Sequence, residues 1–151
     1  MKTFNLVVLA TVLALGACGG QGGGNGSDKS YDACQLVTAD EARALVGDPV
    51  TNTGGGGSIC GWIPEGEKIS YLNVSIGEGA MPEGGQNVEL LRFDDIGDGA
   101  IAMVREGDVI EFYVQKGDYV LRLNMPFLDV PPDGATFEEV KRVAKAAAGR
   151  M

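Results

Sequence analysis

Apolar residues occupy every second position in several short segments in the middle of the chain, which is the period of a strand buried on one face. We expect strands at Ser58–Ile63, Ile69–Ile76, Val88–Phe93, Ile101–Arg105, Val109–Gln115 and Tyr119–Met125. Two short connections, Glu106-Gly107-Asp108 and Lys116-Gly117-Asp118, suit antiparallel hairpins. In the strand before the second connection, the alternation predicts that Ile110, Phe112 and Val114 share the buried face.

Two segments with helical spacing flank these strands. Ala39–Val46 follows Thr38, which forms the pattern of a capping box with Glu41. Thr136 and Glu139 repeat that pattern before an apolar stripe. The stripe consists of Phe137, Val140, Val143, Ala144 and Ala147. This order of elements predicts an α+β fold, with an antiparallel sheet of about five or six strands and an N-terminal and a C-terminal helix packed on it.

The first 17 residues predict an export signal. Lys2 precedes the largely apolar segment Phe4–Leu15, which is too short to span a bilayer. The residues Leu15-Gly16-Ala17-Cys18 resemble the bacterial lipobox. The resemblance implies cleavage of a lipoprotein signal peptide at 1–17 and a diacylglycerol on Cys18, so the partner at this end is a membrane. The alternative is an ordinary secretory signal that happens to contain a cysteine.

The resemblance also implies a location. A lipid on Cys18 anchors the protein in the bacterial cell envelope, because several buried acyl chains hold a protein stably on a membrane. The next residue is Gly19 rather than Asp. By analogy with sorted lipoproteins, this implies the periplasmic leaflet of the outer membrane if the source has one.

A glycine-rich segment follows the anchor. Six of the twelve residues from 19 to 30 are Gly and none is apolar, so this stretch cannot bury enough surface to fold. We therefore expect a tether at 18–30 and a single α+β domain at 31–151.

The charge balance excludes several classes of function. The chain has 12 Lys and Arg against 21 Asp and Glu, for a net charge of −9. Nucleic-acid binding is not expected, because no basic surface is available to neutralise phosphates. The absence of His excludes His-dependent nucleophilic catalysis and imidazole metal sites. No cofactor is expected.

Cys34 and Cys60 remain once Cys18 is assigned to the lipid. An even pair in an exported domain predicts a disulfide. The alternative is a redox or metal pair, which the lack of a C-x-x-C motif and of a third thiol disfavours.

Two short motifs contain the cysteines of the domain: Asp32-x-Cys34-x-Leu36-Val37-Thr38 and, later, Cys60-x-Trp62. They resemble the opening of a group of small uncharacterised bacterial lipoproteins and exported domains. Ile96-Gly97-Asp98-Gly99-Ala100 is similar to a later segment of that group, although Asp95 stands where the group has its first Gly. The resemblance implies the disulfide, the capped helix and the sheet, and no activity.

Five aromatic residues are candidates for a binding surface, each with a structural alternative. Trp62 presents its ring to a ligand or packs beside the disulfide. Tyr71, Tyr113 and Tyr119 form a row on the open sheet face or pair across strands. Phe127 lies in an apolar run after the last strand, which covers the sheet end or contacts a partner.

The remaining polar candidates point to no specific chemistry. Asp94, Asp95 and Asp98 form the densest acidic cluster, which we interpret as a solvated turn in preference to a calcium site. No Ser lies in a hydrolase motif. The acidic pairs that remain lie in Gly-rich segments of a small domain, so an enzyme is not expected.

These patterns predict a membrane-anchored envelope lipoprotein with a non-enzymatic binding domain, for a protein or another envelope component. A small-ligand binding or sensing module is the first alternative, and a minor hydrolase is the second. They differ in what they require: a ligand module needs an apolar pocket, whereas a hydrolase needs two titratable groups converging in one.

Overall fold

A computed structural model of the chain describes residues 30–47, 50–53, 56–64 and 71–151. In these ranges the chain forms three helices and seven strands. The helices are α1 (Ala33–Leu36), α2 (Ala39–Val46) and α3 (Ala135–Arg150). The strands are β1 (Val50–Asn52), β2 (Ile59–Pro64), β3 (Leu72–Glu78), β4 (Glu89–Phe93), β5 (Gly99–Arg105), β6 (Asp108–Lys116) and β7 (Tyr119–Asn124). Residues 1–29, and with them Cys18 and most of the expected tether, lie outside the described residues.

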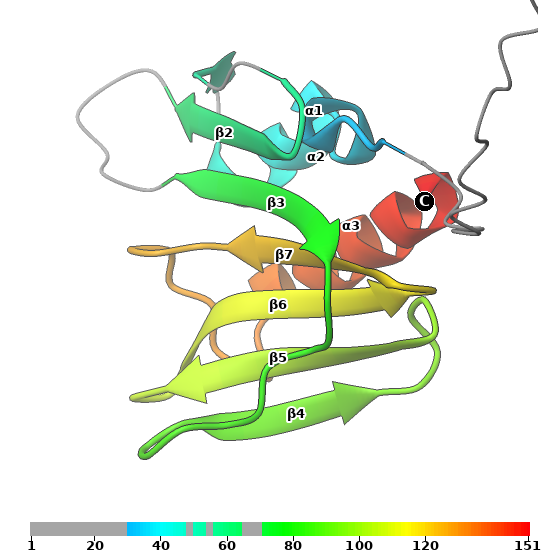
Figure 1. The fold of residues 1–151 in the computed structure, drawn as a ribbon. Helices are drawn as coiled ribbons and strands as arrows, with labels where there is room; N and C mark the ends of the chain where they lie inside the picture. The colour runs from blue at the N-terminus through cyan, green and yellow to red at the C-terminus, as the bar shows by residue number, and fades with distance from the viewer. Residues whose placement is uncertain (1–29, 48–49, 54–55, 65–70) are drawn as a thin grey trace, which may run out of the picture.

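The strands form one antiparallel sheet in the order β1-β2-β3-β7-β6-β5-β4, and the helices lie together against one of its faces (Figure 1). This confirms the predicted α+β fold. The sheet has one strand more than expected, because the short edge strand β1 pairs with the end of β2. The four-residue helix α1 was also not predicted. No helix in the described ranges combines the length and apolarity that crossing a membrane requires.

The chain crosses the sheet once, between β3 and β4. Consecutive strands β4 to β7 form a meander, and β7 returns to pair with β3. The connection from β3 therefore passes over the face opposite the helices (Figure 1). Gly79 N donates to Asp118 O at 3.0 Å, and a Cβ on Gly99 would lie 3.7 Å from the Met81 side chain. This connection explains why Ile101, which is not part of the helix-side core, is fully buried.

The core lies between the sheet and the helices. The predicted stripe of α3 is buried from Phe137 to Ala147, as the helical spacing indicated. Phe93, Phe112 and Phe137 form an aromatic cluster, with ring centroids 5.6 to 6.2 Å apart. Such pairs add stability beyond their buried area.

Helix α2 begins as the sequence predicts. The Glu41 backbone N–H donates to Thr38 Oγ1 at 3.3 Å, and the Thr38 backbone N–H donates to Glu41 Oε2 at 2.9 Å, which completes the capping box.

The predicted capping box of α3 is wrong. The helix begins one residue before Thr136, at Ala135, with Gly134 as N-cap and no side-chain cap. Glu139 binds Arg142 instead, at 2.6 and 2.9 Å. Thr136 is thus already inside the helix, where its hydroxyl does not cap the first turn.

The predicted inward face of β6 is partly wrong. The β5–β6 register shifts between Met103 and Val104, so that Met103 pairs with Glu111 and Val104 with Val109. Val109 is therefore fully buried, whereas Ile110 is only half-buried. A bulge inserts one extra residue and reverses the alternation before it.

The predicted disulfide joins Cys34 in α1 to Cys60 in β2, with a Cα–Cα distance of 5.1 Å. It ties the first helix to the sheet across a sequence separation of 26 residues.

Candidate functional site

Phe127 lies in a tight turn that follows β7. Leu128 N donates to Met125 O at 3.4 Å across the turn, and Pro126 and Phe127 occupy its central positions. Phe127 has a φ of 66°, which with the preceding proline is the arrangement of a type II turn, where Gly is favoured at the second central position. A bulky residue there costs about 1–2 kcal/mol relative to its relaxed backbone. The Phe127 side chain nevertheless gains little burial, since the residue is 74% exposed.

The ring of Phe127 belongs to an exposed apolar patch, which we define as Ile63, Tyr71 and Phe127. The rings of Tyr71 and Phe127 meet edge to face with centroids 6.3 Å apart. The β2–β3 register pairs Trp62 with Leu72, and so brings Ile63, which is 41% exposed, to the same end of the sheet as Tyr71. The patch therefore combines three side chains from the ends of three strands.

The three strand tyrosines do not form the row that we considered. Tyr71 lies just before β3, in the apolar patch, whereas Tyr113 lies on the open face of β6. Tyr119 shares the helix-side face of β7 with Leu121 and packs against the core.

Tyr113 forms a polar cluster with Glu111 and Arg122 on the open face. Its hydroxyl donates to Glu111 Oε2, and Arg122 Nη2 binds Glu111 Oε1. The Arg122 guanidinium also lies 5.9 Å from the centroid of the Tyr113 ring. Burial, followed by the hydrogen bond to Glu111, raises the pKa of Tyr113 to about 12. The phenol is thus held protonated and does not act as a base near neutral pH.

Tyr119 lies on the wall of a small hollow at the start of the described chain. Its ring meets that of Tyr31 edge to face at 4.9 Å. The hollow has a volume of about 280 Å³ and is lined by Ile76, among others. This is slightly below the range of about 300–1,000 Å³ that is usual for ligand pockets.

Trp62 is 6% exposed and does not present its ring at the surface. It lies on the helix-side face of β2, two residues from Cys60, as expected for packing beside the disulfide. Among the described residues, no hydrogen-bond partner for its Nε1 is found.

The acidic cluster separates into two structural contacts. Asp98 Oδ2 accepts from Gly117 N at 2.7 Å and joins the 94–98 turn to the β6–β7 hairpin, and this bond lowers the pKa of Asp98. The turn requires Gly97, where a Cβ would lie 2.5 Å from Gln115 O. Asp95 binds Lys145 of α3 at 3.1 Å, and this contact lowers the pKa of Asp95. The described ranges contain no cluster of three or more potential metal ligands among the His, Cys, Asp and Glu side chains.

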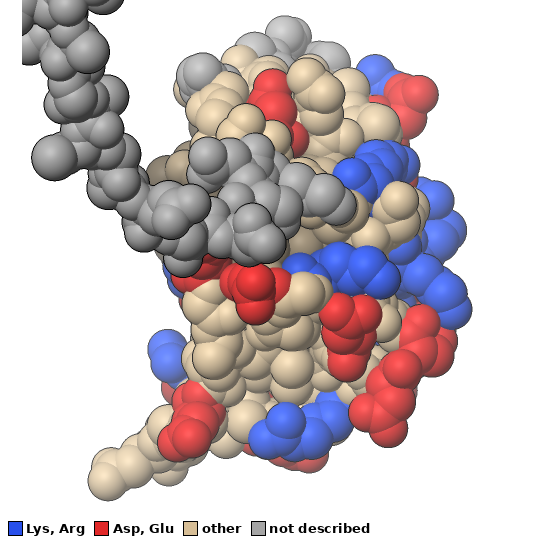
Figure 2. All heavy atoms as spheres, turned by 45° about the vertical axis from the view of Figure 1, so that its right-hand side comes forward, with Lys and Arg blue, Asp and Glu red and all other residues tan. Residues whose placement is uncertain are grey.

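The cations of α3 also lie beside carboxylates. Figure 2 shows Lys and Arg side chains adjoining Asp and Glu side chains along one side of the domain. Lys141 binds Glu138 at 2.6 Å, and its ammonium lies 5.7 Å from the centroid of the Phe93 ring. These cations are thus paired with carboxylates at the surface.

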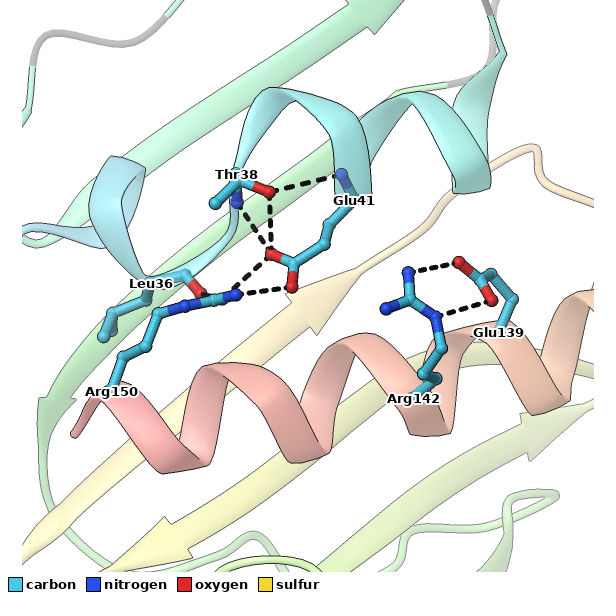
Figure 3. Close-up of polar contacts among 6 residues, drawn as sticks. All are labelled: Leu36, Thr38, Glu41, Glu139, Arg142 and Arg150. Atoms are coloured by element: carbon cyan, nitrogen blue, oxygen red, sulfur yellow. Dashed lines mark hydrogen bonds and ion pairs between the residues drawn. The ribbon is translucent and has the colours of Figure 1, made fainter.

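An ion pair between the buried Glu41 and the partly exposed Arg150 joins the start of α2 to the end of α3 (Figure 3). Arg150 donates to Glu41 at 2.6 and 2.9 Å and to Leu36 O at 2.5 Å. Burial alone raises the pKa of Glu41, but the hydrogen bonds from Arg150 and Thr38 outweigh it and hold the pKa below its usual value. Because Nη1 and Nη2 of Arg150 both bind Glu41, and Nη1 also binds Leu36 O, we interpret this cluster as structural.

Comparison with known proteins finds no match: no family model, no curated protein and no solved structure is similar to this chain.

Proposed function

We propose that the chain is a lipoprotein of the bacterial cell envelope, anchored through Cys18, whose α+β domain binds an envelope protein and catalyses no reaction. In a source with two membranes, the anchor lies in the periplasmic leaflet of the outer membrane. The proposed binding surface is the apolar patch of Ile63, Tyr71 and Phe127.

The observation that carries the proposal is that Phe127 combines a strained backbone with an exposed ring. Its backbone adopts a conformation that favours glycine, and its ring, apart from the edge-to-face contact with Tyr71, remains exposed to water. Neither property stabilises the fold, and strained residues persist mainly where they serve a function. An aromatic ring at the surface is a favourable contact for a protein partner, because a side chain with two torsions loses little entropy on binding.

The polar groups support a non-enzymatic role. The Glu111–Tyr113–Arg122 cluster contains a phenol whose pKa is about 12, and Glu41 is neutralised by Arg150. Neither cluster offers a group that exchanges protons near neutral pH, which acid–base catalysis requires.

Two substitutions of Phe127 separate the backbone strain at this position from the contribution of the ring to binding. Phe127→Gly removes the ring and the strain, whereas Phe127→Ala removes the ring and keeps the strain. We expect the Gly variant to be about 1 kcal/mol more stable than the Ala variant, by urea denaturation.

Both variants should lose the partner that in-envelope crosslinking captures with the wild-type protein. Ile59→Ala is the matched control, because Ile59 is 55% exposed and lies at the other end of β2. Ile59→Ala should still be crosslinked to the partner. If both Phe127 variants are crosslinked to the partner as well, the patch is not the binding surface.

The anchor is tested separately. Cys18→Ala should release the protein from membranes or leave it with its leader, because the thiol that receives the lipid is gone. A variant that fractionates and migrates like the wild type contradicts the anchor.

The hollow between Tyr31 and Tyr119 favours a second candidate, a small-ligand sensing module. Native mass spectrometry of the purified protein tests it. A stoichiometric bound metabolite that Tyr119→Ala abolishes supports this second function.

A further inference from the structure

Strand β4 leaves one edge of the sheet open. It is the last strand in the sheet order and pairs with β5 alone, in continuous register from Glu89 to Phe93. Among the residues that the structure describes, no further strand or helix covers this edge, which lies below β4 in Figure 1. Alternate residues of an edge strand point N–H and C=O groups away from the sheet, and these groups can pair with another strand. The edge contains neither Pro nor a bulge, which are common means of blocking such pairing.

The two faces of β4 differ in chemistry. Leu91 and Phe93 face the helices, and alternation places Glu89 on that same face. Leu90 and Arg92 lie on the open face. Next to Phe93, the ammonium of Lys141 lies over the ring, beside a hollow of about 260 Å³. The helix-side face thus has the Glu89 carboxylate at one end of the strand and, at the other, the Lys141 ammonium, which Glu138 of the same helix also contacts at 2.6 Å.

We propose that a second copy of this chain pairs with β4 in antiparallel orientation, around a two-fold axis at Leu91. This register opposes all five residues of the strand, with Glu89 opposite the copy's Phe93 and Leu90 opposite its Arg92. Glu89 then reaches the Lys141 ammonium of the copy, and the symmetry forms this contact twice. Opposite charges on neighbouring strands stabilise such pairing.

The neighbouring symmetric registers are poorer. An axis at Arg92 places this residue opposite Arg92 of the copy, so that two like charges face each other. An axis at Leu90 places Glu89 opposite Leu91 of the copy, away from Lys141. A two-fold pairing also uses the same surface on both molecules, as isologous dimers do. The edge is therefore complementary to itself, which favours a second copy over an unrelated strand.

Crosslinking at the axis tests the proposal. In a Cys18→Ala background, Leu91→Cys places two thiols opposite each other, at the Cβ separation of about 4.5–5.5 Å that opposed strand residues have. Asp118→Cys is the matched control, because Asp118 is exposed on the β6–β7 turn, away from β4. We expect the purified full chain to form a disulfide-linked dimer on oxidation with Leu91→Cys, in clear excess over Asp118→Cys.

Charge reversal provides a second measurement, with Leu91 and Asp118 left at wild type. Glu89→Lys should raise the dimer Kd by at least about fivefold in sedimentation equilibrium, because it replaces two attractive contacts by two repulsive ones. Adding Lys141→Glu should restore the dimer. Monomers at every concentration, equal crosslinking of the two cysteine variants, or a Kd that Glu89→Lys leaves unchanged overturns the proposal. If Leu91→Cys in a chain that keeps Cys18 crosslinks to a different protein in intact envelopes and forms no homodimer, the proposal is overturned as well.

Discussion

Replacing Arg150 by Met removes the cation that neutralises Glu41 and keeps the length of the side chain. Glu41 is 7% exposed, so its carboxylate is left buried with only its contacts to Thr38. Removing one partner of a buried pair typically costs about 3–5 kcal/mol. Because the side chain of Arg150 is itself 35% exposed, water screens part of the interaction, and we expect a loss of about 2–3 kcal/mol at pH 7.

The loss should depend on pH in a specified direction. Arg150 and Thr38 lower the pKa of Glu41 in the folded state. The stability that this provides is present above the unfolded pKa and disappears as the pH falls through the folded pKa. In the Arg150→Met protein the lowering by Arg150 is gone while burial still acts to raise the pKa, so the pKa of Glu41 should be higher than in the wild type. The difference between wild type and variant should therefore be smaller at pH 4 than at pH 7.

Urea denaturation monitored by fluorescence measures both effects, because Trp62 is the single Trp of the chain and is buried in the core. Arg142→Met is the matched control. Arg142 lies on the same helix, but it is more exposed than Arg150 and binds Glu139 at the surface (Figure 3), so its replacement should cost far less. Adding Glu41→Gln to Arg150→Met should recover part of the loss, since Gln still caps α2 without a charge. Equal costs at the two pH values, or for the two arginines, refute the reasoning.

Three further outcomes are expected. Thr38→Ala should lower the free energy of unfolding by about 1 kcal/mol, because it removes an N-cap, whereas Thr136→Ala should change it little, as it caps nothing; equal losses in urea denaturation contradict the assigned helix starts. Replacing both Cys34 and Cys60 by Ala should destabilise the protein by about 3.5 kcal/mol in the chain-entropy model for this loop, and a loss below about 1 kcal/mol contradicts a stabilising crosslink. In absorbance titration Tyr113 should ionise near pH 12, so its contribution to stability is complete below the unfolded pKa of about 10 and is lost as the pH rises through 12; ionisation near pH 10 in the folded protein contradicts its burial beside Glu111.

The elements with local signals were predictable from the sequence. Thr38 and Glu41 are three residues apart, and their capping box formed as expected. The Gly-Asp hairpins and the apolar stripe of α3 are local patterns too. Thr136 and Glu139 show the limit of such patterns, because Gly134 with the preceding Pro131 turn starts the helix earlier.

The features that distant residues create could not be predicted in this way. Arg150 lies 109 residues from Glu41, and no spacing rule connects the two. The bulge opposite Met103 and Val104 leaves no mark on the alternation of apolar residues in either strand sequence. The alternation alone therefore predicted that Ile110 is buried. Phe127 follows a proline, but without a glycine at its own position the sequence gives no sign of a type II turn.

The pairing of β3 with β7 governs when this protein can fold. Strands β1, β2 and β3 come first along the chain, yet the partner that completes their side of the sheet is the last strand. During synthesis, the edge of β3 that pairs with β7 therefore stays unpaired until β7 has emerged, so the complete sheet forms only then. A chain that ends before β7 lacks the strand that joins β3 to β6, so it cannot form the continuous sheet.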